Sequence, residues 1–274
     1  MNVKEVLART GFRFTRSLGQ NFILDENLLA AVAADAGVTA GDTVIEIGAG
    51  AGTLTRILAA RAARVIAYEI DQNLRPVLAE TLADCENVTT VFADILRTPR
   101  AEVERAAGGP YKVVANLPYY ITTPILFYFL EQPGNLVSLT VMVQREVADR
   151  LCAPPGGKAY GALTASAALR AKAVLTRPVG RACFTPAPNV DSAVVRLDLY
   201  EAAKTADFTG VNRLIKAAFS MRRKTLVNNL TAAYGIPRET AEAALSAVGI
   251  DRQARAETVA PPAFLSLAAS LSFE

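Results

Sequence analysis

The residues best suited to chemistry occur at positions 116–120, where the chain reads Asn-Leu-Pro-Tyr-Tyr. A short apolar segment before them, residues 113–115, predicts a buried strand, and Pro118 ends it because proline cannot donate to a ladder. In open α/β sheets this strand edge is where ligands bind. Asn116 can accept a hydrogen bond from an exocyclic amine while Tyr119 stacks on a flat ring, which suits a nucleobase. A plain strand end with two core tyrosines explains this run equally well.

A glycine loop follows an earlier predicted strand, residues 44–47, and leads into a helix. Gly48, Gly50 and Gly52 allow the backbone to approach a ligand at the helix N-terminus. Their GxGxG spacing differs from the GxGxxG of dinucleotide-binding folds, and an acid, Glu46, lies inside the strand. Both observations favour a methyl-donor site over a pyrophosphate site.

Acidic residues end the next two predicted strands. Glu69 lies about twenty residues beyond the glycines, where an acid suits a pair of ribose hydroxyls, a placement shared with NAD-binding folds. Asp94 follows the strand predicted at 88–92 and could accept a hydrogen bond from an adenine amine. A simple helix N-cap is the alternative for Asp94.

A further aromatic ring begins the segment 184–192, which reads Phe-Thr-Pro-Ala-Pro-Asn-Val-Asp-Ser. Two prolines stiffen this loop, so we expect Phe184 to be a rigid exposed ring that forms a second stacking face for a base. The alternative is a ring that packs into the core.

Basic residues are concentrated in two places. Five of them and no acid occur between positions 213 and 224, ending with Arg222, Arg223 and Lys224, which favours phosphate contact over a solvated helix face. The first twenty residues are also rich in basic side chains, of which Arg16 is the last, and two phenylalanines lie among them. Such an arm could clamp nucleic acid, or it could be a solvated arm anchored by its rings.

Composition excludes several kinds of site. The 274-residue chain contains no histidine, which removes Ser-His-Asp and Cys-His catalysis and histidine-ligated metals. Its three cysteines form no CxxC pair, so we expect neither a disulfide framework nor a metal site. The net charge of +3 permits a nucleic-acid partner. Without a signal-like N-terminus or a membrane-length apolar run, we expect a soluble cytoplasmic protein with no membrane partner.

Alternating strands and helices up to about residue 200 predict a parallel sheet with helices on both faces. The last two strands, predicted at 173–175 and 193–199, have no clear helix between them and suggest an antiparallel hairpin at one edge. From about residue 207 the pattern is all-helical. One or two helices are predicted over 213–234, with two more over 238–247 and 263–271.

Seven motifs in this order resemble those of the small-subunit ribosomal RNA adenine N6,N6-dimethyltransferases. They are L-G-Q-N-F at 18–22, E-I-G-A-G-A-G at 46–52, Glu69, Asp94, N-L-P-Y-Y at 116–120, F-T-P-A-P-N-V-D-S at 184–192 and F-S-M-R-R-K-T-L at 219–226. One departure is Ile23, where the family usually has leucine. The resemblance covers nearly the whole chain and implies an α/β, Rossmann-like methyltransferase domain with the N-terminal arm (1–203) and a small all-helical RNA- and ribosome-binding domain (204–274).

The resemblance also implies roles for individual residues. S-adenosylmethionine would be bound by Asn21, Ile23, Gly48, Gly50, Glu69, Asp94 and Asn116. The catalytic set would be Asn116, Leu117, Pro118, Tyr119 and Phe184. The family dimethylates two adjacent adenines near the 3′ end of 16S rRNA in a nearly assembled small subunit and acts as an assembly checkpoint. We therefore expect a monomeric enzyme whose Arg222, Arg223 and Lys224 contact RNA.

A mechanism for dimethylation follows from this assignment. The adenine amine would donate its N–H groups to the side-chain oxygen of Asn116 and the carbonyl of Leu117, and Tyr119 and Phe184 would sandwich the base. No strong general base is required, which fits a chain without histidine. Leu117 replaces the first proline of the PPY-type signature of many mono-methylating enzymes, and we hypothesise that it leaves room for a second transfer.

Two other functions are compatible with parts of the pattern. A 23S rRNA adenine methyltransferase of the antibiotic-resistance type shares the fold, but the F-S-M-R-R-K-T-L segment and the long helical tail argue against it. A non-catalytic assembly or transcription factor would be signalled by loss of the glycines, Glu69 or Asn116, all of which are present.

Overall fold

The computed structural model describes residues 3–15 and 18–271, which form two compact units. The sheet unit consists of the described residues up to Ala148 together with Val174–Leu199. The helical unit consists of Asp149–Ala173 together with the described residues from Tyr200 onward.

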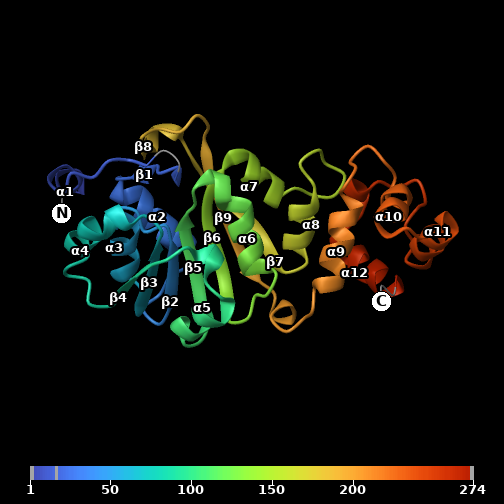
Figure 1. Cartoon of the computed structure of the whole chain (residues 1–274), viewed down its shortest axis with the longest axis horizontal. Helices are drawn as coiled ribbons and strands as arrows, with labels where there is room; N and C mark the ends of the chain where they lie inside the picture. The colour runs from blue at the N-terminus through green and yellow to red at the C-terminus, as the bar shows by residue number, and fades with distance from the viewer. Residues whose placement is uncertain (1–2, 16–17, 272–274) are drawn as a thin grey trace. The chain divides into compact units, whose positions relative to one another are not determined.

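A seven-stranded mixed sheet forms the sheet unit, and its strands lie in the order β4-β3-β2-β5-β6-β9-β7 (Figure 1). Neighbouring strands from β4 to β6 pair in parallel, and β9 runs antiparallel to β6. Their bounds are β2 (Thr43–Ile47), β3 (Arg64–Glu69), β4 (Val88–Phe92), β5 (Tyr111–Asn116), β6 (Leu136–Gln144), β7 (Ala171–Val179, in the sheet unit from Val174 onward) and β9 (Ser192–Leu199). The predicted parallel sheet is confirmed, with its last two strands adjacent at one edge.

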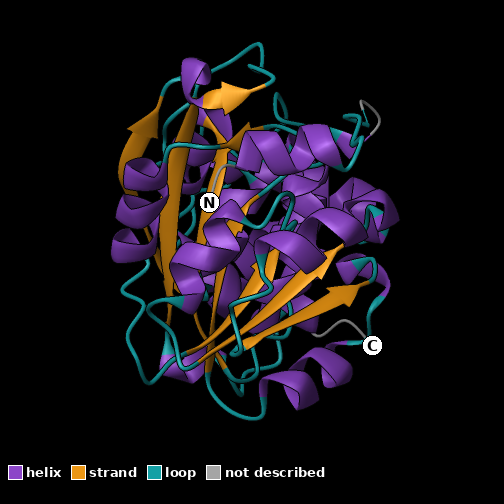
Figure 2. Ribbon diagram, turned by 90° about the vertical axis from the view of Figure 1, so that its left-hand side faces the viewer, coloured by secondary structure: helices purple, strands orange, loops and turns teal. Residues whose placement is uncertain are grey.

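Helices cover both faces of this sheet. Val44 and Ile45 are neighbours on β2 that point to opposite faces, and neither is exposed. Leu29 and Leu54 pack with Val44 on one of these faces, and the strands lie between helices in Figure 2. The helices of the unit are α1 (Val3–Arg9), α2 (Glu26–Asp35), α3 (Thr53–Ala59), α4 (Arg75–Thr81), α5 (Arg100–Ala107), α6 (Thr122–Leu130) and most of α7 (Arg145–Leu151).

The N-terminal segment is more structured than the sequence suggested. It begins with the helix α1, whose Val3 and Val6 are buried in a cluster that also contains residues of α4. The rings of Phe12 and Phe14 then pack against Phe22, with centroids 5.9 and 5.1 Å from it. The phenylalanines therefore anchor this segment, while Arg16 lies outside the described residues.

A second, two-stranded sheet was not predicted. It pairs β1 (Phe22–Ile23) with β8 (Phe184–Thr185) in antiparallel orientation, with Ile23 opposite Phe184. This small sheet joins the N-terminal segment to the loop that carries Phe184.

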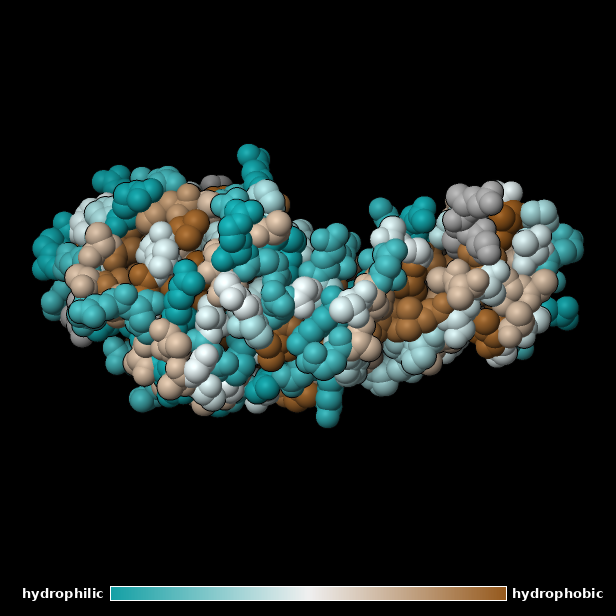
Figure 3. Space-filling model, turned by 90° about the horizontal axis from the view of Figure 1, so that it is seen from below, coloured by the Kyte–Doolittle hydropathy of each residue, from teal (hydrophilic) through white to brown (hydrophobic). Residues whose placement is uncertain are grey.

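The surface is mixed in character. On the face shown in Figure 3, apolar residues are exposed in patches between polar ones. Within the described residues, no helix is long and apolar enough to span a membrane.

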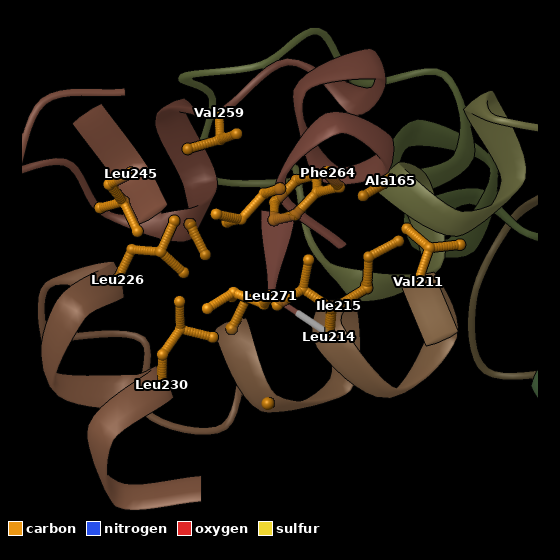
Figure 4. Close-up of a cluster of buried hydrophobic side chains, with 14 of the residues drawn as sticks. Ala165, Val211, Leu214, Ile215, Leu226, Leu230, Leu245, Val259, Phe264 and Leu271 are labelled. Carbon is orange, nitrogen blue, oxygen red and sulfur yellow. The ribbon is translucent and has the colours of Figure 1, made fainter. Parts of the chain in front are cut away.

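The helical unit contains α8 (Ala162–Ala168), α9 (Thr209–Ala218), α10 (Leu226–Tyr234), α11 (Arg238–Ala247) and α12 (Pro261–Ser270). Its core is a cluster of buried apolar side chains that includes Ile215, Leu230, Leu245 and Phe264 (Figure 4). The region predicted as one or two helices over 213–234 contains two, α9 and α10.

The compact units differ from the linear division expected at residue 203. Residues of the segment Asp149–Ala173 belong to the helical unit, because Tyr160 and Ala165 are part of its core cluster. The Tyr160 hydroxyl also donates a hydrogen bond to the Val259 carbonyl, 2.9 Å away. Sequence order alone could not reveal this packing.

Two neighbouring residues of α12 test the importance of this core. Phe264 is fully buried, whereas Leu265 is 43% exposed. We expect Phe264→Ala to lower the free energy of unfolding of the helical unit by about 3–5 kcal/mol, because it removes buried contacts and leaves a cavity. Leu265→Ala should change it little. Urea titration followed by circular dichroism would measure both, and equal effects of the two substitutions would contradict the packing described.

Candidate active site

A cavity of about 230 Å³ opens at the C-terminal ends of the parallel strands of the sheet unit. Five segments build most of its wall: the strap formed by residues 18–23, the end of β2 with the glycine loop, the end of β3, the segment after β4, and residues 116–121 at the end of β5. Phe184 also lines the cavity. The structure thus brings together every residue predicted to bind the cofactor or the base.

The glycine loop takes a conformation that other residues rarely adopt. Gly48, Gly50 and Gly52 have φ angles of +78°, +56° and +81°. At Gly52 a Cβ atom would lie 2.8 Å from the Thr81 hydroxyl oxygen, so both space and backbone angle require glycine there. The loop exposes its backbone to the cavity, as a closely approaching ligand needs.

Glu69 is held in place by the backbone. Its two carboxylate oxygens accept hydrogen bonds from the N–H groups of Gly50 and Asp71, each at 2.8 Å. Burial raises the pKa of the Glu69 carboxyl, and these backbone donors act in the opposite direction. The acid at the end of β3 and the glycine loop therefore form one connected structure.

Glu46 is a second buried acid in the cavity wall, one strand away on β2. Its side chain is 1% exposed, and its Oε2 atom has no hydrogen-bond partner among the described residues. Burial raises the pKa of Glu46 to about 8. The carboxyl group is therefore largely protonated at neutral pH.

Asp94 lies in the cavity wall and also caps a short 3-10 helix, Ile95–Arg97. Its Oδ1 atom accepts a hydrogen bond from the Leu96 N–H at 2.9 Å, and Oδ2 lies 3.5 Å from the Arg97 guanidinium. The alternative N-cap role is therefore present in the structure together with the predicted position in the site.

The cavity is lined by acids without bases. Glu46, Glu69 and Asp94 contribute three carboxyl groups, and no lysine or arginine occurs among the described lining residues. A wall of this kind suits a cationic ligand such as a sulfonium and disfavours a pyrophosphate. Across the described residues, no group of three potential metal ligands is found.

Asn116 ends β5 with its amide held in one orientation. Its Nδ2 atom donates a hydrogen bond to the Asn21 carbonyl at 3.0 Å, which leaves Oδ1 as the acceptor available to a ligand. Leu117 follows with a buried side chain, and its N–H donates to the Met142 carbonyl at 3.2 Å. A proline at this position would lose that hydrogen bond as well as changing the shape of the site.

The aromatic residues differ in exposure from the prediction. Phe184 is only 4% exposed and belongs to a core cluster, because its strand pairs with Ile23. The expectation of an exposed ring was wrong, although Phe184 does line the cavity. Tyr119 also lines the cavity, and its hydroxyl lies 2.6 Å from the Ser192 Oγ atom on β9, which fixes the ring.

Several lining residues were given no individual role from the sequence. Tyr120 is 56% exposed and lies close to Gly19, where an added Cβ would be 3.2 Å from its ring. Leu18, Ile70 and Leu96 also line the cavity. The available signal was their position within the motifs 18–22 and 116–120 or next to the predicted acids Glu69 and Asp94.

The basic residues Arg222, Arg223 and Lys224 lie in the helical unit, in the exposed turn between α9 and α10. The alternative of a solvated helix face does not apply, because these three residues lie outside both helices. Their contact with RNA stays a prediction. Arg222 donates a hydrogen bond to the Lys158 carbonyl at 2.7 Å and lies 3.8 Å from Glu257, an acid brought near from later in the chain.

A Rossmann-like sheet that carries this glycine loop, these strand-end acids and the Asn-Leu-Pro-Tyr motif defines an S-adenosylmethionine-dependent methyltransferase. Comparison with known proteins narrows the class. The family model described as ribosomal RNA adenine dimethylase matches residues 11–272, so the chain belongs to this family. It is an enzyme of the rRNA adenine dimethyltransferase type.

Sequence similarity to known relatives covers nearly the whole chain. Ribosomal RNA small subunit methyltransferase A of Enterococcus faecalis is 42% identical over 98% of this chain and 94% of the relative. The protein of the same name from Geobacillus thermodenitrificans is 44% identical over the same shares.

Two solved structures are also similar. A dimethyladenosine transferase from Plasmodium falciparum has a TM-score of 0.77 at 25% identity, covering 90% of this chain and 95% of that one. The 23S rRNA methyltransferase ErmE has a TM-score of 0.70 at 29% identity, covering 92% and 100%.

Substitution of one glycine tests the geometry of the glycine loop. We expect Gly52→Ala to destabilise the sheet unit by about 1–3 kcal/mol, because alanine is strained at positive φ and its Cβ would meet Thr81. Gly41→Ala is the matched control, since nothing lies within 4 Å of a Cβ there. Thermal unfolding would measure the stability of the two variants. If Gly52→Ala is as stable as the wild type, the loop is not constrained as described.

Proposed function

We propose that this enzyme transfers methyl groups to N6 of two adjacent adenines near the 3′ end of 16S rRNA. It acts on the small ribosomal subunit in the cytoplasm, as a monomer, and the modification serves as a checkpoint of subunit assembly. The observation that carries the chemistry is the Asn116 amide, held by Asn21 so that Oδ1 remains available in the cavity wall. The small-subunit target is favoured by the relatives at 42–44% identity over 98% of the chain.

The cofactor would lie along the acidic wall, held by Asn21, Ile23, Gly48, Gly50, Glu69, Asp94 and Asn116. When bound, S-adenosylmethionine supplies an electrophilic methyl group. Glu69 and Asp94 keep carboxylate lone pairs beyond those used by backbone N–H groups, so each can accept a further hydrogen bond from a hydroxyl or an amine.

The adenine would enter the same cavity from the side of Tyr119. Its amine would donate N–H groups to Oδ1 of Asn116 and to the Leu117 carbonyl, which favours a pyramidal and more nucleophilic nitrogen. A preorganised contact of this kind stabilises a transition state by about 3 kcal/mol. Tyr119, fixed by Ser192, and Phe184 would flank the base, so Phe184 contacts it inside the cavity and not at the surface.

No strong base is needed in this scheme. The amine becomes acidic once it is methylated and loses its proton readily, and the chain contains no histidine. Leu117, buried where a proline occurs in many mono-methylating enzymes, would leave room for an amine that already carries one methyl group.

The assignment of Asn116 predicts a separation of catalysis from binding. Asn116→Ala removes the acceptor Oδ1, so we expect methyl transfer to fall at least a hundredfold while affinity for small subunits stays within about twofold. Transfer of labelled methyl groups to undermethylated small subunits and a filter-binding assay would measure the two quantities. Thermal unfolding would control for the lost hydrogen bond to Asn21. Normal turnover of the variant would refute the role of Asn116.

The turn between α9 and α10 predicts a salt-dependent RNA contact. Replacing Arg222, Arg223 and Lys224 by glutamine should weaken small-subunit binding and reduce the slope of log affinity against log salt by about two, because fewer phosphates are neutralised. Exposed Lys172 and Arg252, changed to glutamine, are controls in the same unit. If the triple variant keeps the affinity and slope of the wild type, the turn is only a solvated surface.

A further inference from the structure

Glu46 is a buried carboxyl group in the cavity wall to which the proposed function assigns no individual contact. It lies on β2, is 1% exposed, and its Oε2 atom has no hydrogen-bond partner among the described residues. Glu69, by contrast, has backbone N–H donors on both oxygens. A buried ionised carboxylate without such partners is costly, so Glu46 must either stay protonated or receive a compensating positive charge.

The surroundings of Glu46 supply no such charge from the protein. The described lining of the cavity holds the acids Glu69, from the neighbouring strand β3, and Asp94, but no lysine or arginine. Burial raises the pKa of Glu46 to about 8; the Thr55 hydroxyl lowers this pKa and the nearby Glu69 carboxylate raises it. With no ligand in the cavity, Glu46 therefore holds its proton at neutral pH.

We propose that Glu46 is a further cofactor-site residue whose carboxyl group loses its proton to solvent when the positively charged cofactor binds. This rests on the assignment of the cavity to S-adenosylmethionine. The sulfonium brings the positive charge that the wall lacks, and an ionised Glu46 then stabilises it. Binding of the cofactor and release of a proton are thus coupled.

The coupling has a direction with pH. Below pH 8 the free protein holds a proton on Glu46 that the complex has lost, so raising the pH favours the complex. The affinity for S-adenosylmethionine rises through Glu46 by at most about tenfold per pH unit. It levels off once Glu46 is ionised in the free protein. S-adenosylhomocysteine, the product, has a neutral sulfur, so Glu46 regains its proton more readily beside it. This difference favours exchange of product for fresh cofactor between the two methyl transfers.

Isothermal titration calorimetry in buffers of different ionisation enthalpy tests the proposal. At pH 7 we expect the wild type to release more protons on binding S-adenosylmethionine than Glu46→Gln, by up to about one proton per site. Titration of the cofactor's own amine is common to both proteins and cancels in this difference. With S-adenosylhomocysteine the difference should shrink. Glutamine mimics the protonated carboxyl in shape, and thermal unfolding would confirm that the variant folds.

A second measurement on the unmodified enzyme keeps the test independent of the variant. Difference infrared spectroscopy should show loss of one carboxylic-acid C=O band when S-adenosylmethionine binds. Equal proton release by wild type and variant, or no loss of this band, would overturn the role of Glu46. If the wild type binds no cofactor at all, the assignment of the cavity itself fails, which distinguishes the two failures.

Discussion

One hydrogen bond connects the part of the cavity proposed to bind the cofactor with the residue proposed to bind the adenine amine. The Nδ2 atom of Asn116, at the end of β5, donates to the carbonyl of Asn21, 95 residues earlier in the chain and 3.0 Å away. It fixes the amide so that the oxygen is the free acceptor, and it ties the strap 18–23 to the edge of the sheet. An amide that could rotate would offer a donor as readily as an acceptor, so the proposed chemistry of the site depends on this contact.

Electrostatics complements this geometry. Parallel strands bring Glu46, Glu69 and Asp94 to one edge of the sheet, and the cavity between them has no basic residue in its described lining. Backbone N–H groups stabilise Glu69, while Glu46 lacks a full set of partners. The wall is therefore suited to a cation, and the difference between a charged cofactor and its neutral product becomes a difference in protonation.

Local patterns were enough to predict the sheet, the glycine loop and the strand-end acids, since apolar periodicity and glycine spacing are visible over a few residues. Long-range packing was not visible. The pairing of Ile23 with Phe184 involves strands of two residues, too short to show a period, and it buries a ring that was expected to be exposed. The placement of Arg222 in a turn, and of Tyr160 in the helical core, likewise depends on contacts between distant segments.

The substrate is the most direct point at which the account can fail. The enzyme would be incubated with labelled S-adenosylmethionine and undermethylated small subunits, and in a separate reaction with labelled S-adenosylmethionine and large subunits. The labelled positions in the RNA would then be mapped. We predict label only in small-subunit RNA, as N6,N6-dimethyladenine at two adjacent adenines near the 3′ end. Label in large-subunit RNA, or no transfer to small subunits by an enzyme that binds the cofactor, would contradict the account.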